Sequence, residues 1–254
     1  MVKASKKSIR DYWNRFPCIP KGLSSDQATA VRYHLEPMIP GFAQFSNYRN
    51  KLVLEVGCGA GTDFVQFVQQ SAQAIGIDAS LESLQICKTR LRGKSLVASL
   101  ILGDAENLPF RSAIFDLVYS FGVLHHVANT QAAIHQVYRV LRNDGELKVM
   151  LYHRTSLITL HLMFRKCYLR GHFESLDSFL SKYQESPGTK AYSVNQAKRM
   201  FSRFRNVVAN PTITSYDLTK LFSFLYFSPH IVFPARLKAI INRFGWFMLI
   251  TAVK

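Results

Sequence analysis

Short apolar runs alternate with amphipathic stretches through the middle of the chain. Leu52–Val56 is apolar and ends in glycines, and the next segment places Phe64, Phe67 and Val68 at helical spacing. The same alternation recurs up to residue 153 and predicts a parallel sheet covered by helices. The expected strands are Leu52–Val56, Ala74–Ile77, Leu96–Leu102, Phe115–Ser120 and Glu146–Tyr152, and the expected helices are Thr62–Gln70, Ser80–Leu91 (with Ser80 as N-cap) and Thr130–Leu141.

The flanks follow a different pattern. Helical pieces are expected at Ser8–Arg15 and Asp26–Leu35 before the sheet, and at Leu157–Leu169 and Asn195–Phe204 after it. Val207–Thr214 and Trp246–Val253 have strand composition and should complete the sheet as a late pair around the insertion Tyr216–Phe244. We therefore divide the chain into an N-terminal helical cap (1–50), a core (51–153), and substrate-cap helices with the final strands (154–254).

Charge is distributed unevenly along the chain, whose formal net charge is +16. Residues 1–50 carry 8 Lys/Arg and 3 Asp/Glu, residues 51–150 carry 9 of each, and residues 151–254 carry 15 and 4. The middle is therefore neutral, and the flanks hold the whole excess. Basic flanks fit an anionic partner such as phosphate, nucleic acid or acidic lipid, and they fit a solvated surface equally well.

Cysteine spacing and hydropathy restrict the location and the metal chemistry. The four cysteines (Cys18, Cys58, Cys87 and Cys167) form no C-x-x-C pair, so we expect reduced thiols in a cytoplasmic protein and no metal site. No apolar segment follows the basic N-terminus, so no secretory signal is expected. The longest uncharged run, Leu221–Ala235, has 15 residues, whereas a span needs about 20. We expect no transmembrane segment and at most a peripheral membrane contact.

The sharpest motif is a glycine loop between the first strand and the first helix of the core. It reads Val53-Leu-Glu-Val-Gly57-Cys-Gly59-Ala-Gly61-Thr-Asp63. Gly57 allows a tight turn, and Gly59 allows a ligand to approach the backbone. A dinucleotide fingerprint would have its third glycine at position 62, where this chain has Thr62. The spacing therefore opposes a nicotinamide dehydrogenase.

Acidic residues follow the next two strands. Asp78 ends the second strand, where a carboxylate can accept hydrogen bonds from both hydroxyls of a ribose or, alternatively, serve as a helix N-terminal acid. Asp104 follows the third strand and can accept from an exocyclic amine. Ligands of open α/β sheets bind beyond the carboxyl ends of the strands, so these residues should share one site.

Together, residues 51–153 resemble the class I S-adenosylmethionine (SAM)-dependent methyltransferase superfamily, near the type 11 group with the ubiquinone/menaquinone C-methyltransferases. The resemblance implies an α/β, Rossmann-like, seven-stranded, mostly parallel sheet with helices on both faces, an N-terminal helical cap and a helical insertion before the last strand. Asn143-Asp144-Gly145 departs from the family's frequent Pro-Gly-Gly but is still suited to a turn. By this resemblance SAM is the cofactor, and its contacts are Glu55, Gly57, Cys58, Gly59, Gly61, Asp78 (ribose), Ala79, Asp104 and Ala105 (adenine), and Phe121 (methyl-transfer region).

Three histidines are candidates for a catalytic base. His125, His126 and His153 follow strand ends on the cofactor side, and the ordinary pKa of histidine, about 6.5, suits proton transfer. Tyr152 has weaker standing, and at least one of the paired histidines is as readily explained by loop packing. We expect His126 or His153 to assist deprotonation of the acceptor.

The predicted function is in-line methyl transfer from SAM to a small-molecule or lipid-like acceptor. Phe222, Phe224, Tyr226, Phe227 and Phe233 are expected to form core and an apolar acceptor pocket. An RNA or protein acceptor is the alternative, suggested by the basic run 198–205. Helical spacing there predicts that Met200, Phe201 and Phe204 are buried, and no Asn/Asp-Pro-Pro-Tyr motif follows the fourth strand, so nucleic acid is disfavoured. A non-enzymatic SAM-binding protein is the third interpretation.

Overall fold

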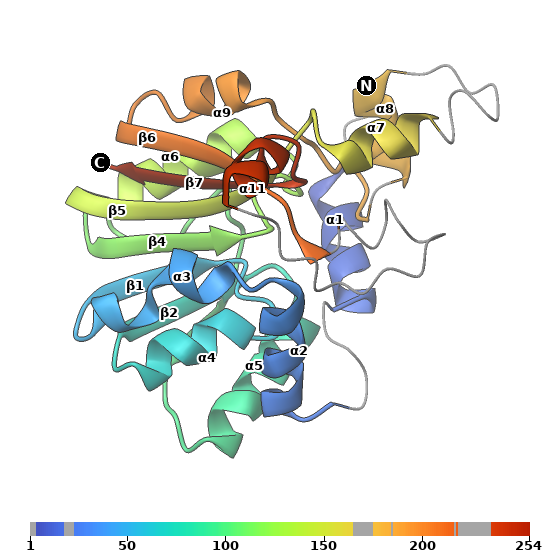
Figure 1. The fold of residues 1–254 in the computed structure, drawn as a ribbon. Helices are drawn as coiled ribbons and strands as arrows, with labels where there is room; N and C mark the ends of the chain where they lie inside the picture. The colour runs from blue at the N-terminus through green and yellow to red at the C-terminus, as the bar shows by residue number, and fades with distance from the viewer. Residues whose placement is uncertain (1–3, 18–22, 165–174, 184, 216, 218–234) are drawn as a thin grey trace.

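Seven strands form one sheet in the computed structural model of this chain (Figure 1). The structure describes residues 4–17, 23–164, 175–183, 185–215, 217 and 235–254. The strands are β1 (Leu52–Val56), β2 (Gln73–Asp78), β3 (Ser99–Leu102), β4 (Phe115–Phe121), β5 (Leu141–Tyr152), β6 (Arg205–Thr212) and β7 (Phe247–Val253).

The strand order is β3-β2-β1-β4-β5-β7-β6. Strands β1 to β5 are mutually parallel, whereas β7 runs antiparallel to both of its neighbours, β5 and β6. The order reverses at β1, which has β2 on one side and β4 on the other. A crevice opens beyond the carboxyl ends of such a pair of strands because the connections leave in opposite directions. This topology fixes the position of the site.

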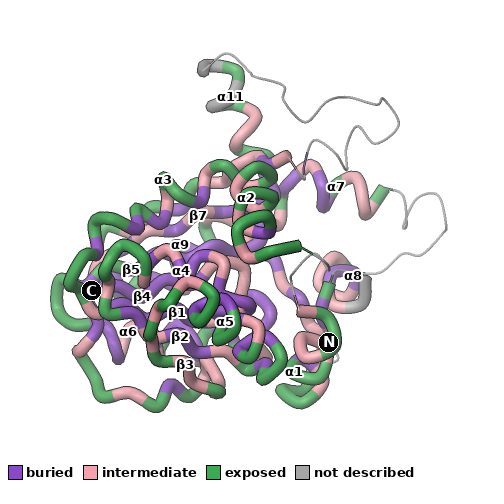
Figure 2. The backbone as a smooth tube through the Cα atoms, turned by 90° about the horizontal axis from the view of Figure 1, so that it is seen from below, coloured by how far each residue is buried: buried purple, intermediate pink, exposed green. Residues whose placement is uncertain are grey.

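Helices cover both faces of the sheet and bury two separate apolar clusters. On one face, α4 and α5 pack with α3 and the short helix η1 around Phe67 and Tyr119; on the other face, α6 and α9 pack around Val118 and Val149. Figure 2 shows the buried residues concentrated along the strands and between these layers. The helices of the core and flanks are α2 (Ser25–Leu35), α3 (Ile39–Ala43), η1 (Phe45–Tyr48), α4 (Thr62–Gln69), α5 (Leu81–Gly93), α6 (Thr130–Val140), α9 (Val194–Met200) and α11 (Ala235–Asn242).

Three further helices gather at the carboxyl end of the parallel strands. They are α1 (Lys6–Arg15), α7 (Leu157–Met163) and α8 (Leu176–Tyr183), and Figure 1 shows them at the end of the sheet to which β4 points. A third apolar cluster packs residues of α7 and α8 against the ends of β5 and β7, and it includes Tyr152, Phe179 and Trp246. No helix of the described residues is long and apolar enough to cross a membrane.

The predicted fold class is confirmed, including the late strand pair and the cap of Ser80 on α5. Several boundaries differ from the predicted ones, and among the described residues the largest differences are in β3, β5 and α9. Strand β3 begins at Ser99 rather than Leu96, because the Leu96 amide still bonds the Leu91 carbonyl at the end of α5. Strand β5 begins earlier than predicted, at Leu141, and α9 ends at Met200, where Phe201 leaves helical geometry.

Two further predictions concern the flanks. Phe201 and Phe204 are buried and Met200 is partly buried, as their helical spacing predicted. The five aromatic residues between 222 and 233, Cys18, Cys167 and the predicted helix beyond residue 164 lie outside the described residues. The division at residues 50 and 153 stays a prediction, although α3 and η1 already pack onto the sheet with α4.

Candidate active site

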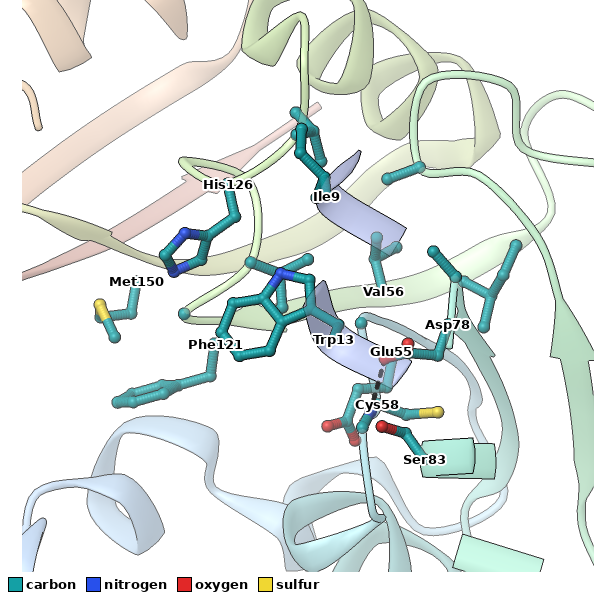
Figure 3. A pocket seen from close by; sticks show the side chains of 18 of the residues that line it. Ile9, Trp13, Glu55, Val56, Cys58, Asp78, Ser83, Phe121, His126 and Met150 are labelled. Carbon is teal, nitrogen blue, oxygen red and sulfur yellow. Dashed lines mark hydrogen bonds between the residues drawn. The ribbon is translucent and has the colours of Figure 1, made fainter. Parts of the chain in front are cut away.

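A cavity of about 830 Å³ opens beyond the carboxyl ends of β1, β2 and β4. Its floor is the glycine loop after β1, and one wall is the helix α1, which contributes Ile9 and Trp13. Figure 3 shows the Trp13 ring between Phe121 and His126 on one side and Glu55 and Asp78 on the other. The volume lies within the range of about 300–1,000 Å³ that is typical of small-ligand pockets.

The glycine loop is held in left-handed backbone geometry. Gly57 has φ +74° and Gly59 has φ +52°, conformations that cost other residues free energy. A Cβ at Gly57 would lie 2.2 Å from a Val123 methyl, whereas a Cβ at Gly59 would meet no protein atom within 4 Å. Protein therefore fills the space next to Gly57, and the space next to Gly59 is open for a ligand.

Glu55 supplies a buried carboxylate at the end of β1. The residue is 4% exposed, and its Oε2 atom has no hydrogen-bond partner among the described residues. Burial and repulsion by Asp63 raise its pKa well above the ordinary value. An unpaired buried carboxylate is costly, so a ligand that brings a hydrogen-bond donor or positive charge would be stabilised here.

Asp78 connects β2 to the glycine loop. Its Oδ2 accepts from the Gly59 amide at 2.8 Å and its Oδ1 accepts from the Ser80 amide at 2.8 Å. Burial raises its pKa above the ordinary value, although these backbone hydrogen bonds oppose the rise. Asp78 therefore fixes the loop and still carries lone pairs at the cavity wall for hydroxyl donors.

Helix α1 closes the cavity beside β3. The Lys6 ammonium lies 2.6 Å from Asp104 Oδ2 and 3.0 Å from Glu106 Oε2. The side chains of Lys6 and Asp104 are 56% and 40% exposed, so this ion pair contributes little to stability. The contact links α1 to the residue that follows β3. A ligand amine that reaches Asp104 can take the place of the Lys6 ammonium.

Arg32 on α2 forms a second ion pair at the cavity, which the sequence did not predict. Its guanidinium lies 3.3 Å from Asp63, whose carboxylate also accepts hydrogen bonds from the hydroxyls of Tyr33 and Tyr119. The same guanidinium lies 5.4 Å from the centre of the Phe121 ring. Asp63 belongs to the glycine motif, but nothing in the sequence around it predicts its contact with a helix in residues 1–50.

The predicted catalytic histidines separate into one at the cavity wall and two behind it. His126 lines the cavity, but His125 and His153 are absent from its described lining. His125 is fully buried and packs against Tyr152 at 3.8 Å between ring centres, and burial lowers its pKa well below the ordinary value. His153 uses Nδ1 at the Gly245 carbonyl and Nε2 at Thr155. Of the three candidates, the structure therefore places only His126 at the described cavity wall.

The remaining predicted cofactor contacts do reach the cavity, with one exception. Cys58, Ala79, Ala105 and Phe121 line it together with Glu55, Gly57, Gly59, Asp78 and Asp104. Gly61 does not, because a Cβ there would meet Cys87 Sγ at 2.3 Å, so this glycine serves the packing of α5 against the loop. Cys58 and Cys87 are buried free thiols.

Glu185 and Tyr152 complete the far end of the cavity. The Tyr152 hydroxyl donates to Glu185 Oε2 at 2.7 Å, and His126 Nε2 lies 3.3 Å from the same oxygen. Glu185 was missed in the sequence analysis because it lies between α8 and α9 in a segment without a recognisable motif. Only the folded chain brings it beside strand β5.

Comparison with known proteins agrees with this geometry. Residues 54–149 match the family described as "Methyltransferase domain". The chain is 29% identical over 161 residues to the phthiotriol/phenolphthiotriol dimycocerosates methyltransferase of Mycobacterium tuberculosis, covering 55% of this chain and 58% of that protein. The chain spans about half the length of such curated relatives, between 47% and 58% for two of them.

Solved structures share the fold over nearly the whole chain. The geranyl diphosphate C-methyltransferase of Streptomyces coelicolor aligns with a TM-score of 0.63 at 12% identity, covering 100% of this chain and 98% of that one. A possible histamine N-methyltransferase of Thermotoga maritima aligns with a TM-score of 0.56 at 17% identity, covering 97% and 99%. At these identities the likeness concerns the fold. Residues 54–149 are therefore a methyltransferase domain, and the chain has the fold of the class I SAM-dependent methyltransferases.

Proposed function

We propose that this protein transfers a methyl group from SAM to a small-molecule or lipid-like acceptor bound in the cavity below α1. The observation that carries the proposal is the paired arrangement of Glu55 and Asp78 around an open space at Gly59, within the methyltransferase domain. Both carboxylates and the glycine lie at the strand ends where the topology opens a crevice.

The residues present fit SAM. The unpartnered Glu55 Oε2 suits an ammonium group, such as that of the methionyl part, and the open side of Gly59 admits a ligand close to the backbone. Asp78 offers acceptor lone pairs for the ribose hydroxyls, and Asp104 offers them for the adenine amine once Lys6 moves aside. When bound, SAM supplies a methyl carbon activated by its sulfonium.

The chain's own residues supply position and exclusion of water. Trp13 and Val123 enclose the cavity from above and from the loop after β4, and Phe121 forms an apolar wall at the end of that strand. Holding two reactants in line supplies on the order of 7–11 kcal/mol of the barrier reduction. This is the contribution that we assign to the closed cavity.

The acceptor class rests on the walls of the cavity and on the relatives. Aromatic side chains from three separate elements (Trp13, Phe121 and Phe247) form an apolar surface large enough for a small organic molecule. The mycobacterial relative is named for a lipid substrate and the Streptomyces structure for a prenyl diphosphate, which supports a lipid-like acceptor. We propose neither an RNA or protein acceptor nor a purely regulatory role.

Tryptophan fluorescence tests the cofactor half of this proposal. The chain has 2 tryptophans, and both Trp13 and Trp246 line the cavity, so their emission should change when S-adenosylhomocysteine binds. Asp78→Asn should weaken that binding at least tenfold because it removes the anionic acceptor for the ribose, while Glu82→Gln, an exposed carboxylate on α5, should not. Unchanged emission on titration of the wild-type protein would refute the proposal.

A further inference from the structure

The cavity has the opposite charge to the rest of the chain. Three basic side chains (Lys6, Arg10, Arg32) and seven acidic ones line it among the described residues, a formal charge of −4, although the chain as a whole carries +16. The acidic residues are Glu36, Glu55, Asp63, Asp78, Asp104, Glu106 and Glu185. Among the described residues, the positive charge of the flanks therefore does not line the cavity, and the described lining does not favour an anionic acceptor.

Most of these acids already have a cation or a cofactor group assigned to them. Lys6 contacts Asp104 and Glu106, Arg32 contacts Asp63 at 3.3 Å and Glu36 at 3.7 Å, and Glu55 and Asp78 face the cofactor. Glu185 differs, because among the described residues no Lys or Arg lies within ion-pair distance of it. Among the described lining residues, Glu185 is therefore the acid whose charge is open to a cationic group of the acceptor.

Glu185 has a strained backbone, and its side chain is held by hydrogen bonds. Its backbone φ is +38°, a left-handed conformation that is unfavourable for a residue with a Cβ. Its side chain remains 40% exposed. Burial alone would raise its pKa, but the hydrogen bond and the charge interaction with His126, together with the hydrogen bond from Tyr152, outweigh burial and hold the pKa below the ordinary value. Glu185 is therefore ionised at neutral pH.

His126, by contrast, faces inward with both ring nitrogens. Nδ1 lies 2.9 Å from Ser186 Oγ and 3.0 Å from Thr189 Oγ1, and Nε2 lies 3.3 Å from Glu185. The Thr189 hydroxyl donates to the Ser186 carbonyl, so towards Nδ1 its oxygen can only accept, and both ring nitrogens of His126 are engaged by these hydroxyl groups and by Glu185. His126 thus orients the carboxylate and has no free nitrogen for the acceptor in this arrangement.

Aromatic rings pack against the two residues that contact this carboxylate, Tyr152 and His126. Tyr152 donates to it, Trp13 packs edge-on against His126 at 5.1 Å between ring centres, and Trp246 stacks on Tyr152 at 4.2 Å. The Arg32 guanidinium over Phe121 shows that this end of the cavity already accommodates a cation on an aromatic face. The quadrupole of an aromatic ring attracts a cation placed over its face, and the attraction is stronger when the cation is desolvated.

We propose that the methyl acceptor is an amine carried on an apolar body, and that Glu185 binds its ammonium group and takes its proton. This inference rests on the proposed function and names the acceptor class of the same site. A carboxylate beside aromatic rings binds an ammonium ion better than an alcohol of the same shape, and it repels a carboxylate or a phosphate. The apolar body occupies the aromatic walls.

The reaction balances without another reactant. The R–NH₃⁺ group transfers one proton to the Glu185 carboxylate and becomes R–NH₂. The nitrogen lone pair then forms the new N–C bond to the methyl carbon while the S–C bond breaks and its electron pair stays on sulfur. The products are R–NH₂⁺–CH₃ and neutral S-adenosylhomocysteine, and Glu185 returns its proton to solvent when the product leaves.

Competition among three matched ligands tests this inference without turnover. The protein is saturated with S-adenosylhomocysteine, and tryptophan emission is followed during titration with 2-phenylethylamine, 2-phenylethanol or phenylacetate. We expect the amine to bind at least tenfold more tightly than the alcohol and the carboxylate to bind most weakly. Equal affinities, or tighter binding of the carboxylate, would overturn the inference. Absence of S-adenosylhomocysteine binding would instead overturn the proposed function.

Substitutions at Glu185 test whether its charge causes the preference for the amine ligand. Glu185→Gln keeps an oxygen that accepts from Tyr152, so its thermal midpoint and its S-adenosylhomocysteine affinity should stay near those of the wild type. Its amine affinity should fall to that of the alcohol, Glu185→Asp should retain part of the preference, and Glu82→Gln should retain all of it. An amine preference that survives in a folded Glu185→Gln protein would contradict the assignment. If that variant does not fold, the order of the wild-type affinities for the three ligands decides whether the inference holds.

Discussion

Two glycines of the same loop have different surroundings. Gly57 and Gly59 both have left-handed backbones, but only Gly57 is enclosed by protein, with Val123 against its Cα hydrogen. Gly59 faces the open cavity and donates its amide to Asp78. The first glycine therefore serves the packing of the loop, and the second leaves the space beside it open.

Alanine at each glycine separates stability from binding. Gly59→Ala should lower the free energy of unfolding by only about 1 kcal/mol, the cost of a left-handed residue with a Cβ, but should weaken S-adenosylhomocysteine binding at least tenfold. Gly57→Ala should weaken both, because its Cβ would overlap Val123. Chemical denaturation and the fluorescence titration measure the two effects. Wild-type binding by Gly59→Ala would show that the cofactor does not approach the loop there.

Ser80 connects two helices, α1 and α5, that both contribute residues to the cavity lining. Its hydroxyl caps α5 by accepting from the Ser83 amide at 3.1 Å, and it lies 2.9 Å from Asn14 Oδ1 on α1. Ser193 caps α9 in the same way, through the Gln196 amide, but α9 packs away from the cavity on the opposite face of the sheet. The two caps form a matched pair with different neighbours.

Removing the two hydroxyls should therefore have equal effects on stability and unequal effects on binding. Ser80→Ala and Ser193→Ala should each cost about 1 kcal/mol of unfolding free energy, as lost N-caps do. Only Ser80→Ala should also weaken S-adenosylhomocysteine binding, because α1 loses a contact that holds it over the cavity. Equal binding by both variants would mean that α1 does not depend on Ser80.

The sequence predicted elements better than it predicted contacts between them. Ser80, the glycine loop and Asp78 are local signals, so their roles could be inferred from neighbours along the chain. The contact of Lys6 with Asp104 joins residues far apart in sequence, and no pattern in either segment announces it. Glu185 has the same difficulty, because its role depends on His126 and on a strained backbone.

At the scale of the whole molecule, the last strand depends on a buried carboxylate after β6. Asp217 accepts from the Trp246 amide at 2.9 Å and from the Thr214 amide at 2.7 Å, and it thereby joins the end of β6 to the start of β7. Burial outweighs these hydrogen bonds and raises its pKa to about 6. Because the folded pKa is higher than the ordinary value, protonated Asp217 favours the folded state.

Global stability should therefore depend on pH through this residue. Its contribution should be complete below pH 4 and should be lost as the pH rises through 6, by at most about 3 kcal/mol, since one pKa unit corresponds to about 1.4 kcal/mol. Asp217→Asn should remove this pH dependence from urea unfolding curves, whereas exposed Asp11→Asn should retain it. A wild-type slope between pH 4 and 6 that persists in Asp217→Asn would refute this assignment.

Methyl transfer itself is the most direct test of the account. Purified protein would be incubated with methyl-labelled SAM and an extract of the source cells, and label would be counted in the organic, small aqueous, nucleic-acid and protein fractions. We predict label in a small or organic-soluble product that binds a cation exchanger, and none with Asp78→Asn. Label confined to nucleic acid or protein, or no label above the Asp78→Asn control in any fraction, would contradict the account.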